Sequence, residues 1–548
     1  MNLPERKLRV GVALESIEVP AWQFAILESV VTSDCAEITQ LILKRDAHKH
    51  PSHDVVYKAF NRLERQNPRT NGAAACKPVS AASLLKTAER ITLPPSPGGQ
   101  ADVSFVQYLR ARGLDVLVAL VDPALLPSDK PLAQFGTWYF DVDGRPLLPA
   151  DGSLVGFTEL IHRRSHVATS LQVRLAGETT KRTAFHTCSA IDYLSHEVTR
   201  SEHLWKCSTF VLRSLRACHE MGGHEFINAL QLAPDVDRRR DSALSRAFSA
   251  LVLQLGFLRY LLWRVRKKIG RVLFGERWIL LYSSRGRSPG HSDFTKLTPP
   301  AGRFWADPHA IARDGVHYVF FEDASLQNNF GHISMMSNGG EQRFTAPKAV
   351  IRRPYHLSYP FVFEWRGDYY LIPESASNRT IELYRCTRFP DEWEYRYNLM
   401  EGISAYDATL VEYQGRWWMF AGVKAREGAS TWDELCIFHA ASPVSRNWQA
   451  HKGNPVISDV RRARPAGPLF VDGDQLIRPS QDCSGRYGRA LNLNRVLQLD
   501  DQRYAEVLVN KFEPDWDRSI LAIHSYSRSG AMTFIDAIHR ERKLRARS

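Results

Sequence analysis

The chain has 548 residues, which is long enough for two or three domains. Its hydrophobic fraction of 44% and charged fraction of 24% are those of ordinary globular proteins. The net charge of +13 is concentrated, because residues 238–271 carry ten basic side chains and one acidic side chain, or +9 of the total. This local charge indicates one anionic contact surface and argues against a protein that binds nucleic acid along its whole length.

The cysteines and the N-terminus indicate the compartment. Eight cysteines are scattered without Cys-x-x-Cys pairs, and no long apolar core follows the first residues. We therefore expect free thiols, no secretory signal and a cytoplasmic protein. His219 and His224 are five residues apart with two glycines between them, so they do not share a helix face. No metal site and no cofactor are predicted.

The first part of the chain alternates strand and helix patterns. Short apolar runs with the length of buried strands occur at residues 8–14, 38–43 and 114–120. Helical patterns follow Pro20 and cover residues 55–63, whereas residues 77–100, rich in Pro, Ser and Gly, are predicted to form a loop. This alternation predicts a parallel sheet in an α/β, Rossmann-like domain, which we assign to residues 1–234.

This α/β part resembles the formyltransferase family, whose fold begins with a dinucleotide-binding-like sheet. The resemblance covers roughly residues 8–230. It rests on the opening strand–helix–strand pattern, on Asp115-Val116-Leu117-Val118 and on Phe135-Gly136-Thr137-Trp138-Tyr139-Phe140-Asp141. It implies a formyltransferase-like fold for the domain.

The residues that carry the family's reaction differ here. The family's Gly, Asn and His fall on Gly136, Tyr139 and Asp141, and its later Asp should follow residues 171–175, where Ala-Gly-Glu-Thr-Thr stands. Without a general base and its partner, formyl transfer from a folate donor loses its chemistry. We expect a domain that kept the fold and lost the reaction. A working sugar N-formyltransferase is an alternative that needs a His or Asp base near Asp141.

Residues 235–276 form a basic linker between the two parts. One helical stripe of apolar side chains, in steps of four and three, contains Leu244, Phe248, Leu251, Leu255, Leu258, Leu262 and Val265. The most apolar run, residues 247–263, includes Arg259 and is shorter than the roughly 20 residues of a membrane span. Two readings stay open. Either residues 238–271 lie on an anionic membrane surface at the inner face, or the helix packs on the rest of the protein or a second copy.

Residues 277–548 carry a repeat. Turn-and-strand units recur at Gly315, Gly367, Gly415 and Gly473, at intervals of 52, 48 and 58 residues. A repeat near 50 residues built of short strands is typical of propeller blades. We therefore predict an all-β, five-bladed propeller, with residues 279–282 in the strand that closes the ring. Of Trp417 and Trp418 in mid-strand, at least one should lie in a blade core.

Acidic residues occur at the same distances from the repeat glycine in different repeats. Eight residues before it stand Asp307, Tyr359, Asp407 and Pro465, and seven residues after it stand Glu322, Glu374, Gly422 and Ser480. Because the first strand of each blade lies nearest the axis, we expect the four carboxylates to converge. Paired carboxylates suit glycosyl chemistry, with one ionised and one protonated. The structural alternative is that these aspartates only cap turns.

Other polar residues near the blade starts are predicted to bind substrate. This set contains His356, Tyr359, Arg464, Arg478, Gln481, Asp482 and His524. The two arginines could clamp a phosphate or carboxylate through two hydrogen bonds. Trp305, Tyr359 and Trp432 are candidates for stacking on a sugar, although each aromatic is more often a core residue.

Residues 277–540 resemble the N-terminal propeller domain of glucosamine inositolphosphorylceramide transferase proteins. Motifs that occur in order include Trp305-Ala306-Asp307-Pro308, His356-Leu357-Ser358-Tyr359-Pro360, Ile372-Pro373-Glu374-Ser375, Arg464-Pro465-Ala466-Gly467 and Arg478-Pro479-Ser480-Gln481-Asp482. The propeller is also similar to five-bladed arabinanase-type glycoside hydrolases. That likeness implies Asp307 as the general base, with Asp407 and Glu374 as candidates for the pKa-tuning and acid roles. In the transferase proteins the transferase chemistry belongs to a separate C-terminal domain.

These observations predict a carbohydrate-active enzyme of surface polysaccharide or glycolipid biosynthesis, of the glycosyltransferase or glycosidase type. Its partner would be a nucleotide-linked or lipid-linked sugar, with no nucleic acid. The alternative is a propeller that binds a glycan or glycolipid without catalysis, on a degenerate formyltransferase scaffold. Catalysis needs two carboxylates about 5–9.5 Å apart, whereas ion pairing of all four acids favours binding.

Overall fold

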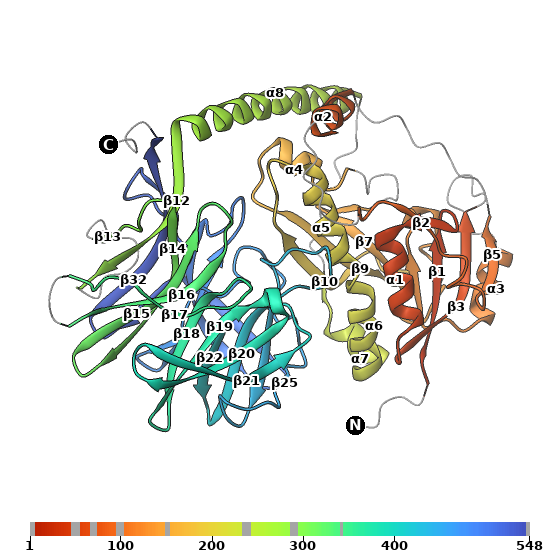
Figure 1. Ribbon diagram of the computed structural model, residues 1–548. Coiled ribbons are helices and arrows are strands. Elements are labelled where there is room, and N and C mark those ends of the chain that lie inside the picture. The colour runs from red at the N-terminus through yellow and green to blue at the C-terminus, as the bar shows by residue number, and fades with distance from the viewer. Residues whose placement is uncertain are drawn as a thin grey trace. The chain divides into compact units, whose positions relative to one another are not determined.

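The computed structural model describes residues 6–44, 55–65, 74–94, 103–147, 154–232, 243–284, 294–339 and 343–543. The chain divides into two compact units. The first comprises Met1–Leu262 with Ala425–Ser430, and the second comprises Trp263–Lys424 with Thr431–Ser548. Helix α8 (Ala243–Leu273) crosses the division (Figure 1). In the described part of the chain, no helix is both long and apolar enough to span a membrane.

The first unit contains a mixed nine-stranded sheet, with the main order β11-β10-β9-β7-β6-β1-β3-β5. Strands β1, β3, β5, β6 and β7 pair in parallel, whereas β9, β10 and β11 add antiparallel pairs. The strands are β1 (Leu8–Leu14), β3 (Ala36–Lys44), β5 (Glu89–Leu93), β6 (Val116–Ala119), β7 (Thr137–Val142), β9 (Val167–Arg174), β10 (Arg182–Ser189) and β11 (Gln231–Leu232), with β8 (Arg145–Pro146) paired to β7. The predicted α/β domain is thus present, with a mixed sheet instead of a purely parallel one.

Helices connect the strands of this sheet. They are α1 (Ala21–Val31), α2 (Val55–Arg65), α3 (Val103–Ala111), α4 (Phe157–Ile161), α5 (His196–Cys207), α6 (Phe210–Met221) and α7 (Gly223–Ala229). The strands and helices predicted near residues 8–63 and 114–120 are confirmed. Gly222, with a φ of 84°, ends α6 and separates His219 from His224 on α7.

The segment predicted to be one loop, residues 77–100, contains two strands, β4 (Pro78–Ser80) and β5. Strand β4 pairs with the short β2 (Glu18–Pro20), and β5 pairs in parallel with β3. The loop prediction was wrong here because the Pro and Gly residues flank β5, whose own residues include β-branched Ile91 and Thr92.

The second unit is a five-bladed propeller, since it contains five sheets of four or five strands. The first three blades each hold a repeat glycine in the turn between their first two strands. The first blade contains β14 (Arg303–Arg313), β15 (Val316–Ser325), β16 (Gly331–Asn338) and β17 (Lys348–Ile351), and the second contains β18 (Ser358–Trp365), β19 (Asp368–Ser375), β20 (Thr380–Arg388) and β21 (Glu392–Glu401). The third contains β22 (Ala405–Tyr413), β23 (Arg416–Val423), β24 (Leu435–Ala440) and β25 (Gln449–Ala450). The fourth contains β26 (Phe470–Asp472), β27 (Gln475–Asp482), β28 (Ala490–Leu499) and β29 (Tyr504–Phe512).

The closing blade joins the two ends of this unit. Strand β12 (Phe274–Ser283) pairs antiparallel with β32 (Met532–Arg542) over its whole length, flanked by β13 (Thr295–Leu297), β30 (Ile520–Ala522) and β31 (Tyr526–Ser529). This pairing confirms residues 279–282 as part of the closing strand. It removes two free sheet edges that would otherwise be open to other chains.

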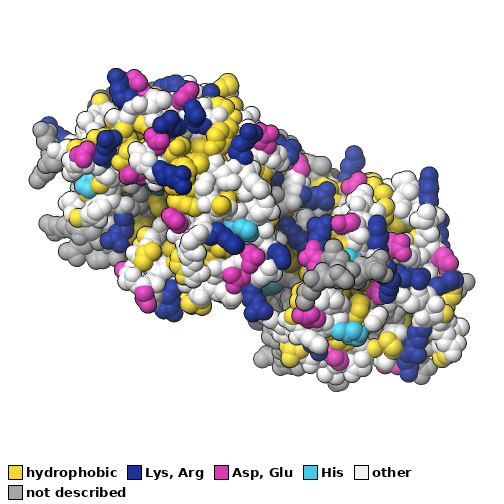
Figure 2. Space-filling model, turned by 90° about the horizontal axis from the view of Figure 1, so that it is seen from below, with side chains coloured by type: hydrophobic (Ala, Val, Ile, Leu, Met, Phe, Trp, Pro, Cys, Tyr) yellow, Lys and Arg dark blue, Asp and Glu magenta, His cyan; other side chains and the backbone are white. Residues whose placement is uncertain are grey.

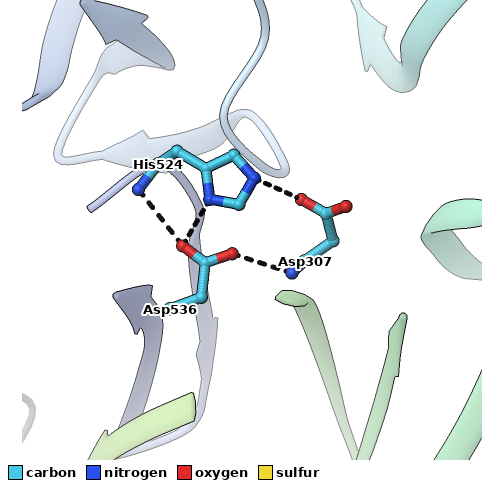
Figure 3. A group of neighbouring side chains, drawn as sticks. All are labelled: Asp307, His524 and Asp536. Carbon is cyan, nitrogen blue, oxygen red and sulfur yellow. Dashed lines mark hydrogen bonds and ion pairs between the residues drawn. The ribbon is translucent and has the colours of Figure 1, made fainter. Parts of the chain in front are cut away.

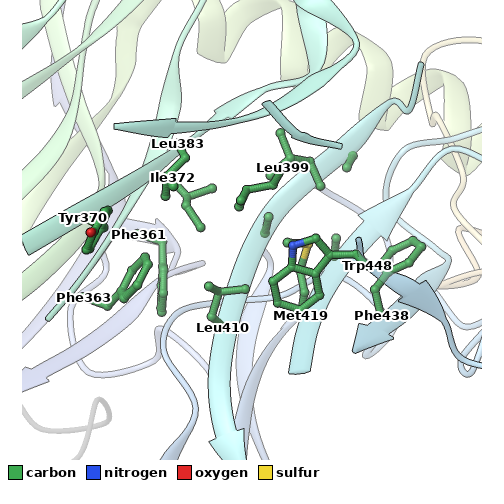
Figure 4. Packing of buried hydrophobic residues seen from close by; sticks show 14 of the residues in the cluster. Phe361, Phe363, Tyr370, Ile372, Leu383, Leu399, Leu410, Met419, Phe438 and Trp448 are labelled. Carbon is green, nitrogen blue, oxygen red and sulfur yellow. The ribbon is translucent and has the colours of Figure 1, made fainter. Parts of the chain in front are cut away.

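The repeat glycines and the blade cores explain the regular spacing. Gly315, Gly367 and Gly415 all have positive φ, as do the residues just before them, which fits two-residue hairpin turns. Aromatic and aliphatic side chains pack between neighbouring blades, as Figure 4 shows for the second and third. Trp418 is buried in such a core, as predicted for at least one residue of the Trp pair.

Candidate functional site

Three inner strands of the propeller share one backbone irregularity. The pairing of β14, β18 and β22 with the next strand shifts register once in each. At each shift one residue other than glycine has positive φ, namely Asp307 (53°), Tyr359 (42°) and Asp407 (54°). These are the residues that stand eight positions before the repeat glycines. Such conformations cost on the order of 1–3 kcal/mol each and recur at functional sites.

Asp307 meets a histidine and a second aspartate from the closing blade (Figure 3). His524 Nε2 lies 3.1 Å from Asp307 Oδ1, and His524 Nδ1 lies 2.7 Å from Asp536 Oδ1. The Ser525 hydroxyl donates a hydrogen bond to Asp307 Oδ1 at 2.9 Å. His524 and Ser525 lie where the chain leaves the sheet between β30 and β31. The ring closure therefore builds this group from both ends of the propeller.

Asp307, His524 and Asp536 are also the group, among the described residues, whose ligand atoms lie close enough to hold a metal ion, within 4.8 Å. The Asp536 carboxylate, however, already accepts the backbone N–H groups of Asp307, His524 and Ser525 and the Nδ1–H of His524. Both ring nitrogens of His524 face carboxylates. The donor set therefore fits an imidazolium between two carboxylates better than a metal centre.

The charges of this group reinforce each other. Burial alone would lower the pKa of His524, but the Asp536 and Asp307 carboxylates raise it to about 10. Burial would raise the pKa of Asp307, but the charge of His524 and the hydrogen bonds from His524 and Ser525 hold it below its usual value. Asp307 is thus ionised at neutral pH, and His524 carries its proton.

Arg464 links the carboxylates of the second and third blades. Its Nε and Nη2 donate to the two oxygens of Asp407 at 2.6 and 3.2 Å, and Nη2 lies 3.3 Å from Glu374 Oε2. The Gln481 side-chain amide donates to Asp407 Oδ2 at 3.3 Å. Burial and the neighbouring Asp407 raise the pKa of Glu374 well above its usual value, against the opposing charge of Arg464. Burial and Asp407 thus favour the protonated form of Glu374, whereas Arg464 favours its ionised form.

Glu322 lies on β15, the strand that pairs with β14, where its backbone is opposite Ala306. Burial raises the pKa of Glu322 well above its usual value, and the negative charge of Asp307 adds to the shift. Its neighbour is His356, whose Nε2 lies 3.5 Å from Glu322 Oε1. Burial lowers the pKa of His356, so this imidazole is neutral at neutral pH. Burial and the neighbouring charges thus shift the pKa values of Glu322 and Asp307 in opposite directions.

Half-buried aromatic rings surround these acids. Trp278 of β12 stacks on the His524 ring at 4.1 Å between centroids, and Tyr487 lies 5.2 Å from the same ring. Tyr487 also contacts Trp432 at 5.4 Å, and the Arg464 guanidinium lies 5.1 Å above the Tyr487 ring. Sequence reasoning did not single out Trp278 as a site residue. The only signal was its place just before the predicted closing strand.

The remaining predicted residues divide into two groups. Tyr359 is buried at the shift in β18, where its hydroxyl bonds with that of Thr409 at 2.7 Å. Arg478 instead forms a two-point ion pair with Glu506, at 2.7 and 2.9 Å, and both are almost fully enclosed. Asp482 pairs with Lys511 at 2.5 Å. This geometry does not support substrate-binding roles for Arg478 and Asp482, since their charges are used inside the fourth blade.

Trp305, a candidate for sugar stacking, is buried in a core cluster with Phe321 and Phe534. In the first unit, Tyr139 and Asp141 occupy the positions where the formyltransferase alignment expects Asn and His. Lys181 Nζ lies 3.9 Å from Asp141 Oδ2 and 5.6 Å from the centre of the Tyr139 ring. These three residues form a Lys–Asp–Tyr group on β7 and the loop before β10.

Comparison with known families matches the propeller. The family described as "Glucosamine inositolphosphorylceramide transferase 1, N-terminal" matches residues 293–519. Glucosamine inositolphosphorylceramide transferase 1 of Oryza sativa subsp. japonica is 35% identical over 242 residues, covering 41% of this chain and 32% of the relative. The protein of that name from Arabidopsis thaliana is 30% identical over 224 residues, covering 40% and 28%. The resemblance predicted for the propeller is confirmed. The chain spans about a third of the length of these relatives.

Solved structures were also compared. A family 117 glycoside hydrolase, Zg3597 from Zobellia galactanivorans, aligns with 49% of this chain and 91% of its own, at a TM-score of 0.33 and 10% identity. The α-L-arabinofuranosidase PaAbf62A from Podospora anserina aligns with 48% of this chain and 97% of its own, at a TM-score of 0.35 and 11% identity. These values are too low to transfer a site or an activity.

Proposed function

We propose that the propeller holds an acid–base centre that acts on the glycosidic bond of a lipid-linked or nucleotide-linked sugar. This centre, called the axial group here, comprises Asp307, Glu322, Glu374, Asp407, Arg464, His524 and Asp536. The observation that carries this proposal is the pairing of Asp307 and Glu322. These acids lie on adjacent strands of one blade, and one is held ionised while the other is held protonated. Acids whose surroundings push their pKa values apart are the arrangement that acid–base catalysis requires.

The hydrogen bonds assign a role to each acid. Oδ1 of Asp307 faces His524 and Ser525, whereas Oδ2 receives no hydrogen bond from the described residues. Oδ2 can therefore accept a proton from an attacking hydroxyl group. Glu322, whose raised pKa favours its protonated form, faces His356 at 3.5 Å, and its proton can pass to the departing glycosidic oxygen. Water as the attacking group would give hydrolysis, and a sugar or lipid hydroxyl would give transfer.

The surroundings and the relatives support a sugar substrate. Trp278 and Tyr487 offer ring surfaces beside the acids. The relatives that match the propeller are named for transfer to inositolphosphorylceramide, a glycolipid precursor by that name. Surface glycolipid or polysaccharide biosynthesis is therefore the proposed setting.

A second function, glycan binding without catalysis, has its own supporting observation. Each of the four acids has a basic or imidazole neighbour: Asp307 faces His524, Glu322 faces His356, and Asp407 and Glu374 share Arg464. A carboxyl group that already faces a basic side chain or an imidazole is less available for catalysis, and this favours a binding module. In this alternative the propeller holds a glycan headgroup that another catalytic centre modifies.

The test uses the full chain and a panel of nucleotide sugars and lipid-linked glycans, with binding measured by calorimetry and product by mass spectrometry. For an acid–base centre, Asp307→Asn abolishes product formation while binding and fold persist. Asp323→Asn is the matched control, because Asp323 follows Glu322 on the same strand and pairs with Arg303 at 2.6 Å. Undiminished turnover in Asp307→Asn would show that this assignment is wrong. Binding by the wild type without any product would support the binding module.

A further inference from the structure

Helix α8 presents a continuous apolar stripe to solvent. Large apolar side chains that are each 52–69% exposed occur in steps of four and three: Leu251, Leu255, Leu258, Leu262, Val265, Ile269 and Val272. This spacing places them on one helix face, about 32 Å long. These side chains are exposed, whereas the helix packs on the first unit through Tyr260 on another face. The stripe lies outside the acid–base group proposed above.

The opposite face of α8 fixes which way the stripe points. Tyr260 is fully buried, and its hydroxyl donates to the backbone oxygen of Tyr193 at 2.8 Å. Gly256 lies so close to His162 that a Cβ there would sit 2.7 Å from His162 Cε1. Tyr260 and Gly256 lie on the face opposite Leu258 and Leu262. The part of the helix that belongs to the first unit is therefore seated with Leu258 and Leu262 turned away from that unit.

The charges on α8 are all of one sign. Its sequence contains Arg and Lys residues but no Asp or Glu. Exposed Arg259 and Arg266 flank the stripe on one side, and exposed Lys268 flanks it on the other. Elsewhere basic and acidic side chains are interspersed, as on the face shown in Figure 2. An apolar stripe between basic flanks is the pattern of a helix that lies in a membrane interface.

A second copy of the chain is the main competing occupant. Packing two stripes together as a coiled coil would place Arg259, Arg266 and Lys268 at the positions that flank the seam. Neither helix could supply an acidic partner for them, so the flanks would repel each other. An anionic surface, in contrast, pairs with every one of these charges.

We propose that α8 binds the anionic surface of a lipid bilayer, with its stripe at the acyl boundary and its basic flanks on the headgroups. The partner is a lipid surface with net negative charge, whatever the headgroup that supplies it. Peripheral attachment of this kind agrees with the absence of a helix in the described residues that could span a membrane. The inference is independent of the chemistry in the propeller.

The test is flotation of the full chain with vesicles of phosphatidylcholine alone or with roughly a third phosphatidylserine. We expect binding only to the anionic vesicles, weakening as salt rises. Replacing Arg259, Arg266 and Lys268 by Gln should lower binding on the order of 100-fold. The matched control replaces the exposed Lys86, Arg90 and Arg110 by Gln and should bind like the wild type.

A second pair of variants tests the stripe itself. Leu258→Asp with Leu262→Asp should abolish flotation, whereas Leu508→Asp, at a similarly exposed apolar residue of β29, should not. Light scattering on the same samples reports the oligomeric state. Equal binding to neutral and anionic vesicles would overturn the proposal. So would a wild-type dimer that becomes a monomer in the stripe variant, since a second copy would then cover α8.

Discussion

Two buried arginines of the propeller, each followed by a proline, have opposite surroundings. Arg478 pairs with Glu506, which also lies 4.0 Å from Arg462, and this ion pair lies inside the fourth blade. Arg464 contacts Asp407 and Glu374 in a group that also holds Asp307, Glu322 and Asp536. With His524 as the other cation, that group has more acids than positive charges, so some of its carboxyls keep their protons. Arg478 and Glu506 therefore form a structural ion pair. The excess of acids around Arg464 and His524 leaves carboxyl groups that can take up or release protons.

Removing Arg478 should have the largest effect. Arg478→Met removes the close ion pair of buried Glu506 and leaves it the more distant cation Arg462, at 4.0 Å; we expect a loss of about 3–5 kcal/mol of unfolding free energy. Denaturant unfolding measures this loss. The double variant Arg478→Met with Glu506→Met should regain much of it, because no buried charge is then left unpaired. A single variant as stable as the wild type would contradict the view that this pair is structural.

Removing Arg464 should cost less and should depend on pH. Arg464→Met removes the positive charge that opposes proton uptake by Asp407 and Glu374, whose pKa values burial already raises. Because the variant binds more protons when folded, its stability loss shrinks as pH falls. We expect a loss of about 1–3 kcal/mol near pH 8 and a smaller loss near pH 5. A loss that is equal at both pH values would argue against proton uptake in the axial group.

A further expected effect is the pH dependence from His524. Its folded-state pKa is raised from 6.5 to about 10, so its contribution to stability is complete below pH 6.5 and is lost as pH rises through 10. His524→Asn should therefore flatten the fall in unfolding free energy over this range. The matched control is His309→Asn, because burial lowers the pKa of His309 to about 4 and it carries no proton there. A wild-type slope in His524→Asn would refute the imidazolium assignment.

Repetition in the sequence located much of the candidate site. Hairpin glycines recur because each two-residue turn needs positive φ. Counting back from each glycine locates the equivalent positions of the inner strands. This spacing identified Asp307, Tyr359 and Asp407, which all lie at a register shift. The sequence could not show that Arg464 and Arg478 have different surroundings, since local sequence does not reveal which acids surround a side chain after the ring closes.

Other site residues had no local signal. Trp278 and Asp536 come from β12 and β32, which are far apart in the chain and meet only when the propeller closes. The Asp536 carboxylate accepts hydrogen bonds from four N–H groups. Three of these are backbone groups whose positions depend on the fold. The loop prediction for residues 77–100 failed for a related reason, because β5 is a strand through its pairing with β3.

By itself the sequence determined the alternation of elements in the first unit, the blade repeat of the second and the basic, amphipathic character of α8. These features depend on local periodicity, turn chemistry and composition, which neighbouring residues carry. Only the tertiary structure decided the protonation of Asp307 and Glu322, the pairing of Arg478, and the outward direction of the α8 stripe. Burial and charge are sums over residues that are distant in the chain, so they exist only once the chain has folded.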